Sequence, residues 1–313
     1  MASNQPHAQS RQGRPRHGER ALAGETAPVS PAGRLRRLLE DGELVVAPGI
    51  FDGLSAHLVR RMGFLAGYLT GAGVAAAGFG LPDIGLVGMS EMVDRVSMVT
   101  GVLAEIPLIA DADTGYGPPP SVTRTVRAYE RAGVAAIQLE DQAFPKRCGH
   151  LPGKELVSVD EYLGKLGAAL DARNEALIIA RTDARAVLGL DAAIERGNAY
   201  AGAGADVIFV EAPRTVEEIT LIAREITAPK LINVVAGGLT PEVDPAMLRQ
   251  LGYSIAIYPT TALLAVANAA VTALRGIGGS HAVPLPMSRM EDFFRVVGLD
   301  EWFAVSERWS GPA

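Results

Sequence analysis

Short apolar runs alternate with amphipathic stretches along the chain from residue 35 onward. The amphipathic stretches, such as residues 191–203 and 215–226, carry apolar residues at three- and four-residue spacing, which is the period of a helix packed on one face. The apolar runs that precede them have the length of buried strands. The runs expected to form strands are residues 44–47, 67–69, 108–110, 136–139, 177–180, 207–210, 231–233 and 255–258. Eight strand-then-helix units in succession predict an α/β fold of the (β/α)8 TIM barrel type rather than an open sheet.

The two ends of the chain differ from this repeating part. Residues 1–33 are rich in Arg, Gln, Ser, Gly, Pro and His without apolar periodicity, so we expect a disordered tail that cannot offset its ordering entropy. Residues 34–275 are expected to form the catalytic barrel, at the usual length of one such domain. Residues 276–313 are expected to be a linker and a C-terminal helical extension, because residues 287–303 carry Met, Phe, Val, Leu and Trp at helical spacing.

The composition of the chain indicates which kinds of binding partner and which cellular compartment to expect. The 313 residues carry a formal net charge of −6, and nucleic acid is therefore not an expected partner, because its binding usually needs a basic face. No apolar run reaches the roughly 18 uncharged residues that a membrane-spanning helix needs. The single cysteine cannot form an internal disulfide, which fits a reducing compartment. The expected location is the cytoplasm.

Two carboxylates follow the third expected strand. Residues 107–110 are apolar, and Asp111 and Asp113 come next, before a turn rich in glycine. In a strand, residues two apart point to the same side, so both side chains can converge on one point. Two converging carboxylates repel each other unless a cation lies between them, and hard oxygen ligands of this kind suit Mg²⁺ or Mn²⁺. The alternative is a solvated turn with two incidental acids.

The only cysteine lies among charged residues. Cys148 follows Lys146 and Arg147 and precedes Gly149 and His150. Cationic neighbours stabilise a thiolate, and a glycine can open the backbone to a small anionic ligand. The flanking Pro and Gly indicate a loop rather than a core strand, so we interpret Cys148 as an acid/base cysteine. The alternative is a buried and inert side chain.

These motifs and several others together resemble the isocitrate lyase/phosphoenolpyruvate mutase superfamily, which includes 2-methylisocitrate lyases, 2,3-dimethylmalate lyases and carboxyphosphonoenolpyruvate mutase. Any one of the motifs would be a weak signal, but they occur in the right order over most of the chain. The matching segments are residues 68–73 (YLTGAG), 80–85 (GLPDIG), 111–117 (DADTGYG), 140–142 (EDQ), 145–150 (PKRCGH), 180–184 (ARTDA), 211–212 (EA), 233 (N) and 258–259 (YP).

Most of these segments follow directly on an expected strand, and barrels of this type carry their chemistry at the C-terminal ends of the strands. The resemblance implies that Asp111 and Asp113 bind the metal, Mg²⁺ or Mn²⁺. It also implies that Asp83 and Glu140 are outer acids that hold metal-bound waters.

The resemblance implies substrate contacts as well. The backbone of Thr70, Gly71 and Ala72 is expected to bind a substrate carboxylate, and Arg181 is expected to make a bidentate pair with another. Gly149 and Asn233 complete the expected substrate contacts.

Catalytic roles follow from the same resemblance. Cys148, on a mobile loop, is the expected proton donor, and Lys146, His150 and Glu211 are expected to set its pKa and position. Tyr68 is the expected general base, with a packing residue at the top of the barrel as the alternative.

The implied chemistry is cleavage of a carbon–carbon bond in a 2-hydroxy dicarboxylate of the substituted-malate type. A retro-aldol, Claisen-type route gives a 2-oxo acid and a carboxylate, with Mg²⁺ stabilising the oxyanions. One alternative is a mutase like carboxyphosphonoenolpyruvate mutase, which shares the Lys-Arg-Cys-Gly-His loop. Another is an oxaloacetate decarboxylase or hydrolase. An inactive binding protein is disfavoured because every expected metal and loop residue is present.

A departure from the family pattern narrows the substrate. Methylisocitrate lyases carry an Arg after the Tyr-Pro pair, whereas residues 260–264 here read TTALL and carry no charge. A third carboxylate would then have no evident counter-ion, and burying it unpaired is costly. A smaller and more apolar dicarboxylate, or a 2-oxo acid such as oxaloacetate, fits better than a tricarboxylate.

The apolar content of residues 287–303 also predicts assembly. It exceeds what a free surface helix normally shows. In the resembling family the last barrel helix and its extension pack on a neighbouring subunit. We therefore expect a helix-swapped homodimer, paired into a homotetramer, with a helix folded back on its own barrel as the alternative.

Overall fold

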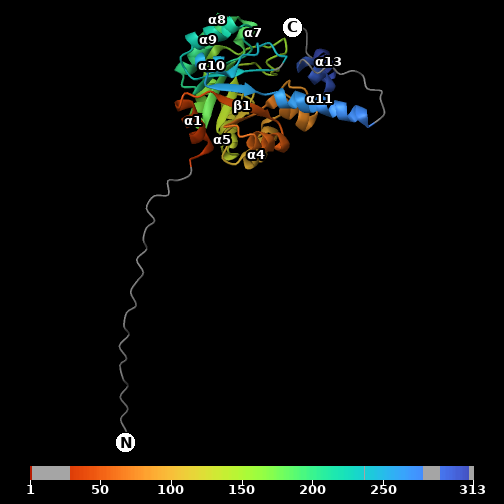
Figure 1. Ribbon diagram of the computed structural model, residues 1–313. Helices are drawn as coiled ribbons and strands as arrows, with labels where there is room; N and C mark the ends of the chain where they lie inside the picture. The colour runs from red at the N-terminus through yellow and green to blue at the C-terminus, as the bar shows by residue number, and fades with distance from the viewer. Residues whose placement is uncertain (2–28, 236, 278–289, 310–313) are drawn as a thin grey trace.

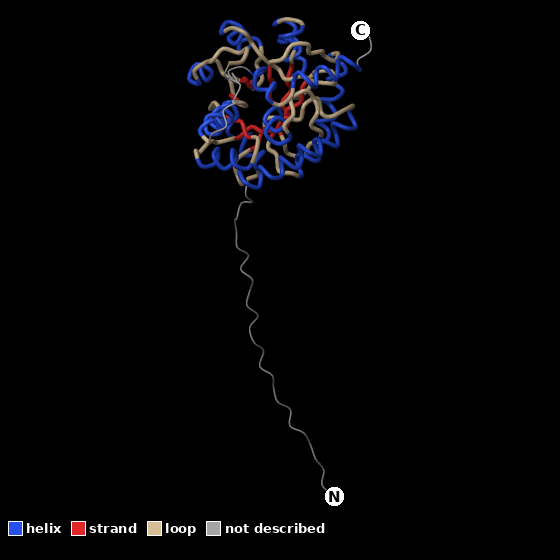
Figure 2. Tube along the Cα trace, turned by 90° about the vertical axis from the view of Figure 1, so that its right-hand side faces the viewer, coloured by secondary structure: helices blue, strands red, loops and turns tan. Residues whose placement is uncertain are grey.

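The protein forms a closed barrel of eight parallel strands in the sequential order β1 to β8, which confirms the expected fold (Figures 1 and 2). The computed structural model describes residue 1 and residues 29–235, 237–277 and 290–309. The strands are β1 (Val45–Ile50), β2 (Gly67–Leu69), β3 (Leu108–Asp111), β4 (Ala136–Glu140), β5 (Leu177–Thr182), β6 (Val207–Val210), β7 (Lys230–Asn233) and β8 (Ile255–Tyr258). Each lies within a few residues of its predicted range.

Helices surround the strands in Figure 2. They are α1 (Pro31–Glu40), α2 (Gly53–Arg61), α3 (Gly71–Val74), the π-helix η1 (Ala75–Phe79), α4 (Met89–Leu103), α5 (Pro119–Arg131), α6 (Val159–Ala172), α7 (Ala184–Val187), α8 (Leu190–Gly202), α9 (Val216–Glu225), α10 (Pro245–Gln250), α11 (Thr261–Gly276), α12 (Met290–Val296) and α13 (Leu299–Trp309). None of the described helices is both long enough and apolar enough to cross a membrane.

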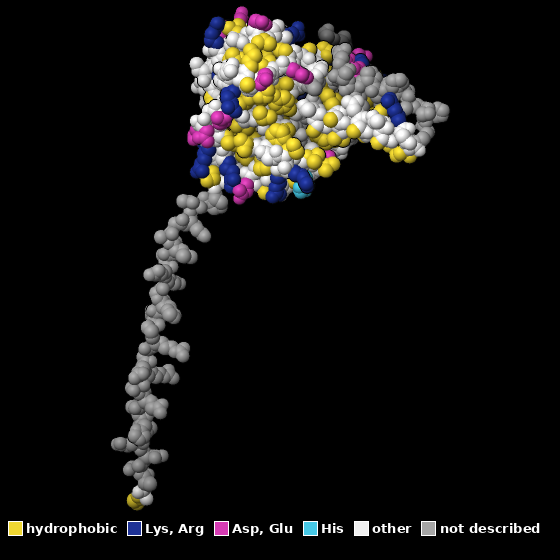
Figure 3. All heavy atoms as spheres, viewed as in Figure 1, with side chains coloured by type: hydrophobic (Ala, Val, Ile, Leu, Met, Phe, Trp, Pro, Cys, Tyr) yellow, Lys and Arg dark blue, Asp and Glu magenta, His cyan; other side chains and the backbone are white. Residues whose placement is uncertain are grey.

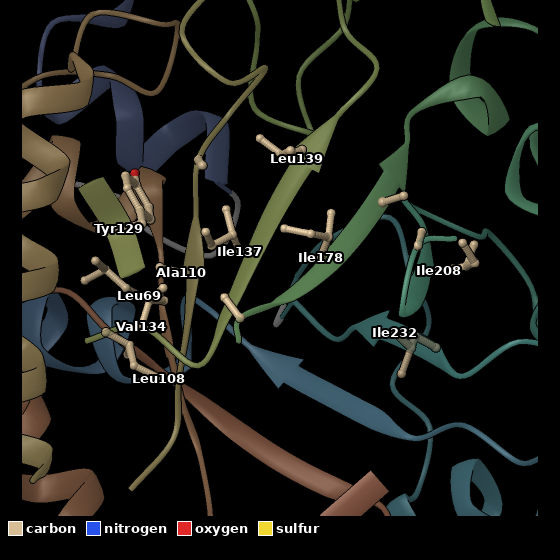
Figure 4. Close-up of a cluster of buried hydrophobic side chains, with 14 of the residues drawn as sticks. Leu69, Leu108, Ala110, Tyr129, Val134, Ile137, Leu139, Ile178, Ile208 and Ile232 are labelled. Atoms are coloured by element: carbon tan, nitrogen blue, oxygen red, sulfur yellow. The ribbon is translucent and has the colours of Figure 1, made fainter. Parts of the chain in front are cut away.

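Most residues of the strands are apolar because both faces of the strands are buried. Ile109 and Ile179 belong to the core inside the barrel. Their neighbours Leu108, Ala110 and Ile178 belong to the layer between strands and helices, shown in Figure 4. Apart from Gln138 within β4 and Lys230 at the start of β7, the charged and amide side chains of the strands lie at their C-terminal ends, and most of the expected site residues lie at or beyond those ends.

Helix α1 begins earlier than the expected end of the tail. Its first residue is Pro31, and the Ser30 side chain accepts a hydrogen bond from the Gly33 N–H at 3.1 Å. A serine N-cap followed by proline is a strong start signal for a helix. Residues 31–33 therefore belong to the fold, and Ala32 and Leu35 are buried in the same core as the inner barrel residues. Residues 2–28 of the expected tail lie outside the described residues.

The expected C-terminal extension forms α12 and α13, which lie against the C-terminal ends of the strands. Phe293 and Phe294 are buried in a cluster that also contains Phe51 and Cys148. Part of the apolar surface of this segment is thus buried within one chain, while Val296, Trp302, Val305 and Trp309 stay exposed. Residues 278–289 of the expected linker lie outside the described residues.

Helix α11 behaves differently. It extends away from the body of the protein (Figure 1), and only Leu263 and Leu264 of its residues are buried. Val266, Leu274 and the following Ile277 are large apolar side chains with exposed fractions of 48%, 66% and 80%. Figure 3 shows further hydrophobic side chains on the face of the body beside this helix.

Candidate active site

The expected site residues gather around a small cavity at the C-terminal ends of the strands. Its volume is about 40 Å³. The lining residues are Tyr68, Thr70, Ala72, Asp83, Asp111, Cys148, Gly149, His150, Arg181, Glu211, Asn233, Val235, Pro259, Thr260 and Met290. The remaining expected residues, Gly71, Asp113, Glu140 and Lys146, contact these lining residues from behind. Every predicted site residue is therefore part of one centre.

Lys146 joins the carboxylates instead of flanking the cysteine. Its Nζ forms a short ion pair with Asp83 Oδ1 and lies 2.6 Å from Asp113 Oδ1, and its side chain is 4% exposed. Burial lowers the pKa of Lys146, but Asp113 and Asp83 outweigh it and hold the pKa well above its usual value. Lys146 is thus a fixed positive charge at the carboxylates, and its charge also lowers the pKa of Cys148, although burial and Asp83 outweigh it.

One ammonium does not balance the charge of this group. Asp83, Asp111 and Asp113 are three acids, and burial, with Asp111 and Asp83 adding to it, raises the pKa of Asp113 to about 7 although Lys146 opposes the shift. Lys146 alone therefore does not offset the burial and the neighbouring acids, and a further cation would supply the missing positive charge.

The oxygen atoms of the two expected metal ligands face one point. A Cβ placed on Gly71 would lie 2.9 Å from Asp111 Oδ2 and 3.6 Å from Asp113 Oδ1, so glycine keeps that point open. Among the described residues, no three His, Cys, Asp or Glu side chains are arranged to hold an ion by themselves. The donor set fits Mg²⁺, which keeps waters and substrate oxygens in its coordination shell.

Asp111 is held by neighbours that the sequence analysis did not identify. Gln138 Nε2 donates to Asp111 Oδ1 at 3.2 Å, and the Asp113 N–H donates to the same oxygen at 3.1 Å. The Tyr68 hydroxyl in turn donates to Gln138 Oε1 at 3.0 Å. A glutamine in the middle of the apolar run of residues 136–139 was the only sequence signal for this contact.

Tyr68 is in the site, but its surroundings do not support a role as general base. Burial, with Asp111 as the next cause, raises its pKa well above its usual value. The side chain is therefore a neutral phenol that donates a hydrogen bond, and a base would need the phenolate. The sequence could not predict this raised pKa, because the acids that surround the hydroxyl come from other parts of the chain.

Arg181 is fixed in orientation by acids on two sides. Its Nε and Nη2 donate to the two carboxylate oxygens of Asp183 at 2.9 and 3.1 Å, and Nη1 lies 3.1 Å from Glu140 Oε2. Glu140 thus pairs with Arg181 through one oxygen. Its other oxygen, Oε1, is buried without a hydrogen-bond partner among the described residues, and burial raises the pKa of Glu140. That free oxygen is available to a metal-bound water.

The cysteine loop is held at its base by a short antiparallel pairing. The Ala143 N–H donates to the Glu155 carbonyl at 2.8 Å, and the Val157 N–H donates to the Asp141 carbonyl at 3.0 Å. The Gln142 side chain then exchanges two hydrogen bonds, each 2.9 Å long, with the backbone of Arg147. Pairing at the base leaves residues 144–154 as a separate unit that covers the cavity.

Several contacts fasten this unit to the rest of the protein, among them the ion pairs of Lys146 with Asp83 and Asp113. The Cys148 N–H donates to the Asp83 carbonyl at 3.0 Å. Lys154, which the sequence analysis missed, donates a short hydrogen bond to the Gly149 carbonyl and lies 3.4 Å from Asp183 Oδ1. The loop is therefore closed, with its cysteine inside.

Cys148 has a different environment from the predicted one. Burial, followed by the charge of Asp83, raises the pKa of its thiol to about 12. Arg147, its cationic neighbour in sequence, turns away and places its guanidinium 5.2 Å from the centre of the Phe303 ring. The expectation of a stabilised thiolate is wrong for this closed state, because adjacent residues in a loop point in different directions. A neutral thiol is nevertheless what a proton donor requires.

His150, Glu211 and Asn233 form one group on the other wall. His150 Nε2 lies 3.4 Å from Glu211 Oε1, and its Nδ1 accepts the Leu239 N–H at 3.2 Å. Burial lowers the pKa of His150, although Glu211 opposes the shift. Asn233 Nδ2 donates to both oxygens of Glu211 at 3.2 and 3.3 Å. This leaves Asn233 Oδ1 buried without a partner among the described residues.

Two further polar groups complete the cavity. Thr260, which the sequence analysis treated only as uncharged, has a buried Oγ1 without a partner within the described part of the chain. Thr70 caps α3 by accepting the Gly73 N–H at 3.2 Å, and the N–H groups of Gly71 and Ala72, in the first turn, have no acceptor inside that helix. These groups can bind substrate oxygens.

Gly149 packs too closely against the barrel to carry a side chain. A Cβ there would lie 2.7 Å from Arg181 Nη2 and closer still to Glu211 Oε1. We expect Gly149→Ala to lower kcat/KM by about a hundredfold, because the loop can no longer close in its present place. Gly164→Ala, at an open position of α6, is the control. Steady-state kinetics and melting temperatures check this, and a fully active Gly149→Ala variant would contradict it.

Comparison with known proteins agrees with the geometry. The sequence profile of the phosphoenolpyruvate phosphomutase family matches residues 35–277. A 2,3-dimethylmalate lyase of Eubacterium barkeri is 46% identical over 278 residues, which cover 87% of this chain and 96% of that protein. A 2-methylisocitrate lyase of Aeropyrum pernix is 47% identical over 271 residues, which cover 86% and 87%.

Solved structures give the same result. Oxaloacetate acetylhydrolase in complex with the inhibitor 3,3-difluorooxalacetate matches with a TM-score of 0.77 and 39% identity, covering 91% of this chain and 99% of that one. Phosphonopyruvate hydrolase in complex with oxalate and Mg²⁺ matches with a TM-score of 0.70 and 30% identity, covering 90% and 99%. The chain is therefore an enzyme that belongs to the phosphoenolpyruvate phosphomutase family, within the phosphoenolpyruvate mutase/isocitrate lyase superfamily.

Proposed function

We propose that this enzyme is a Mg²⁺-dependent carbon–carbon lyase that cleaves a 2-hydroxy dicarboxylate of the substituted-malate type. The observation that carries the proposal is the placement of a neutral thiol, an anchored guanidinium and an under-compensated group of acids around one cavity. The similarity to a 2,3-dimethylmalate lyase over nearly its whole length supports the same reaction class.

The cavity offers separate contacts for the two ends of such a substrate. Arg181 is oriented by Asp183 and presents its guanidinium to one carboxylate. The first-turn N–H groups of Gly71 and Ala72 suit the other. The buried oxygens of Asn233 and Thr260 are free to bind a substrate hydroxyl.

Asp111 and Asp113 would hold Mg²⁺. Glu140 Oε1 and Asp83 would hold the water molecules bound to the ion. When bound, the ion supplies positive charge that stabilises the oxyanions of the reaction. Lys146 cannot replace it, because its single charge is already shared between Asp83 and Asp113.

The loop of residues 144–154 carries Cys148, to which we assign proton transfer to carbon. A base takes the proton of the 2-hydroxyl, and the electron pair of the bond between C2 and C3 moves to C3, which leaves a 2-oxo acid and an enediolate. The enediolate carbon takes the proton from Cys148 Sγ, and the product is a carboxylate. The proton held by the base restores the Cys148 thiol after turnover. Burial keeps this thiol protonated until the enediolate forms.

The closed cavity is too small for such a substrate. A volume of about 40 Å³ holds a few water molecules, whereas a substituted malate has ten or so heavy atoms. The loop of residues 144–154 therefore has to open for entry and close for chemistry. Closure also excludes water from the enediolate.

The walls favour a dicarboxylate with small alkyl groups. Val235, Pro259 and Met290 give the cavity apolar surface. Arg181 is already paired with acids, and burial lowers the pKa of His150, so a third carboxylate finds no free counter-charge among the described lining residues. Hydrolytic cleavage of oxaloacetate is the second candidate, which the similarity to oxaloacetate acetylhydrolase favours.

An assay against four compounds tests the proposal. We expect the purified enzyme with Mg²⁺ to release a 2-oxo acid fastest from 2,3-dimethylmalate, with kcat/KM at least about tenfold above 2-methylisocitrate, because the third carboxylate would be buried unpaired. Oxalate release from oxaloacetate would favour the second candidate. Turnover of phosphonopyruvate alone would replace the lyase by a mutase or phosphonate hydrolase.

We also propose a homodimer, paired into a homotetramer, that is assembled through α11 and acts in the cytoplasm. The exposed apolar side chains of α11 support an interface at this helix. Replacing Leu274 and Ile277 together by Glu is expected to reduce the mass measured by light scattering to that of a monomer. Val305→Glu, at an exposed valine of α13, is the control. An unchanged mass in the double variant would rule out this interface.

A further inference from the structure

A second and much larger hollow lies on the flank of the barrel, outside the catalytic cavity. Its volume is about 990 Å³. Helices α4 and α5 begin at its rim, and α6 contributes Lys165 to its wall. Leu86, Tyr116 and Phe144 give it apolar surface. Ligand sites commonly have this size and this mixture of apolar wall and few polar groups.

Lys165 marks this hollow as a site for an anion. The residue is 8% exposed, and among the described residues its ammonium has neither an ion pair nor a hydrogen bond. Glu161, one turn earlier on α6, does not pair with it although the spacing would allow a contact. The stem of Lys165 is buried, and the residue lines the hollow, so its unpaired ammonium can meet an anion that binds there.

Other groups in the hollow suit an anion as well. Thr114 is 3% exposed, and its hydroxyl likewise has no partner in the described ranges. Arg124 lines the hollow near the N-terminus of the 13-residue helix α5, whose dipole favours negative charge. Of the two acids in the lining, Glu91 accepts the Gly88 N–H at the start of α4 at 2.6 Å, and Glu161 is exposed to solvent.

We propose that this hollow binds an organic anion with an apolar body. The anionic group, a carboxylate or a phosphate, pairs with Lys165 and Arg124. The apolar body lies against Leu86, Tyr116 and Phe144. The site is separate from the catalytic cavity, with which it shares no lining residue.

The position of the hollow links it to the catalytic loop. Thr114 directly follows Asp113, and Phe144 stands at the base of the loop. A Cβ on Gly85 would lie 3.4 Å from Phe144 Cε2 and 3.6 Å from the Lys146 nitrogen, so the wall of the hollow is packed on the loop. A bound anion is expected to favour the closed loop. This last consequence rests on the proposed function, whereas binding itself does not.

Calorimetric titration with octanoate, octyl phosphate, inorganic phosphate and 1-octanol tests the site without measuring activity. We expect one saturable site for octanoate or octyl phosphate, and the tighter of the two identifies the anionic group. Inorganic phosphate lacks the apolar body and 1-octanol lacks the charge, so each should bind at least about tenfold more weakly. Lys165→Met should weaken octanoate binding at least about tenfold, as expected for loss of a charge-assisted contact.

Variants of Lys165 and Arg124 test the two proposed contacts with the anionic group. Lys165→Met removes an unpaired charge and keeps a side chain of similar volume, so the fold is expected to be retained, and Lys165→Arg should keep binding. Arg124→Met should weaken binding, whereas Arg127→Met, on the same helix outside the hollow, should not. Unchanged octanoate affinity in folded Lys165→Met would overturn the site. So would the absence of saturable binding, or a crystal structure in which a second copy of the chain fills the hollow.

Discussion

Asp111→Asn is expected to lower kcat by on the order of a thousandfold, the loss expected when a metal ion no longer stabilises an oxyanion. The change is nearly isosteric, and the Asn oxygen can still accept the hydrogen bonds from Gln138 and from the Asp113 N–H. What is lost is one of the negative charges that attract the cation. Steady-state kinetics at saturating Mg²⁺ measures the effect, and reversible inactivation by EDTA accompanies it in the wild type.

The matched control is Asp171→Asn, at an exposed position of α6 away from the cavity. It should retain full activity. Asp113→Asn should behave like Asp111→Asn, and circular dichroism should show both variants folded. Full activity of the wild type after exhaustive chelation would remove the metal from the mechanism.

Cys148→Ser is expected to lower kcat at least about a hundredfold while substrate binding is retained, because a serine hydroxyl is a far weaker proton donor than a thiol. Serine fits the space of the thiol, and the loop contacts made by the backbone of residue 148 remain. Comparison of kcat with KM, together with the melting temperature, separates loss of the donor from loss of the loop. A normal turnover number would reduce Cys148 to a packing residue.

The raised pKa of Cys148 predicts how the thiol reacts with iodoacetamide. The thiolate is the reactive form, so with a pKa of about 12 alkylation should be slow at pH 7 and should accelerate about tenfold per pH unit toward that pKa. Oxalate with Mg²⁺ should slow it further by holding the loop closed. Rapid alkylation that does not change between pH 7 and 9 would show that the loop is mainly open in solution.

Strand geometry explains only part of the arrangement of the metal-site carboxylates. The sequence placed Asp111 and Asp113 on one side of a strand, but β3 ends at Asp111 and Asp113 has a left-handed backbone with φ of 47°. The two carboxylates still converge, because the turn and not the strand brings them together. The two carboxylates converge as predicted, but strand geometry accounts only for the position of Asp111.

Neighbouring residues of the cysteine loop show a second limit of prediction from the sequence. Lys146, Arg147 and Cys148 are consecutive, yet the lysine binds two aspartates, the arginine turns to Phe303 and the thiol is buried. Backbone direction in a loop changes at every residue, so adjacency in sequence does not predict adjacency of side chains. Gln138, Lys154 and Thr260 escaped notice because each becomes a site residue only through contacts distant in sequence.

The sequence by itself determined the barrel and most of the residues of its site. Strand-length apolar runs alternating with helical periods require both faces of each strand to be covered, and the C-terminal ends of the strands then collect the polar residues that follow. Tertiary structure alone decided the charge state of each group, because pKa values depend on burial and on neighbours from other strands. It also decided that α12 covers the cavity and that α11 stands free, because both helices are apolar in sequence and only packing distinguishes them.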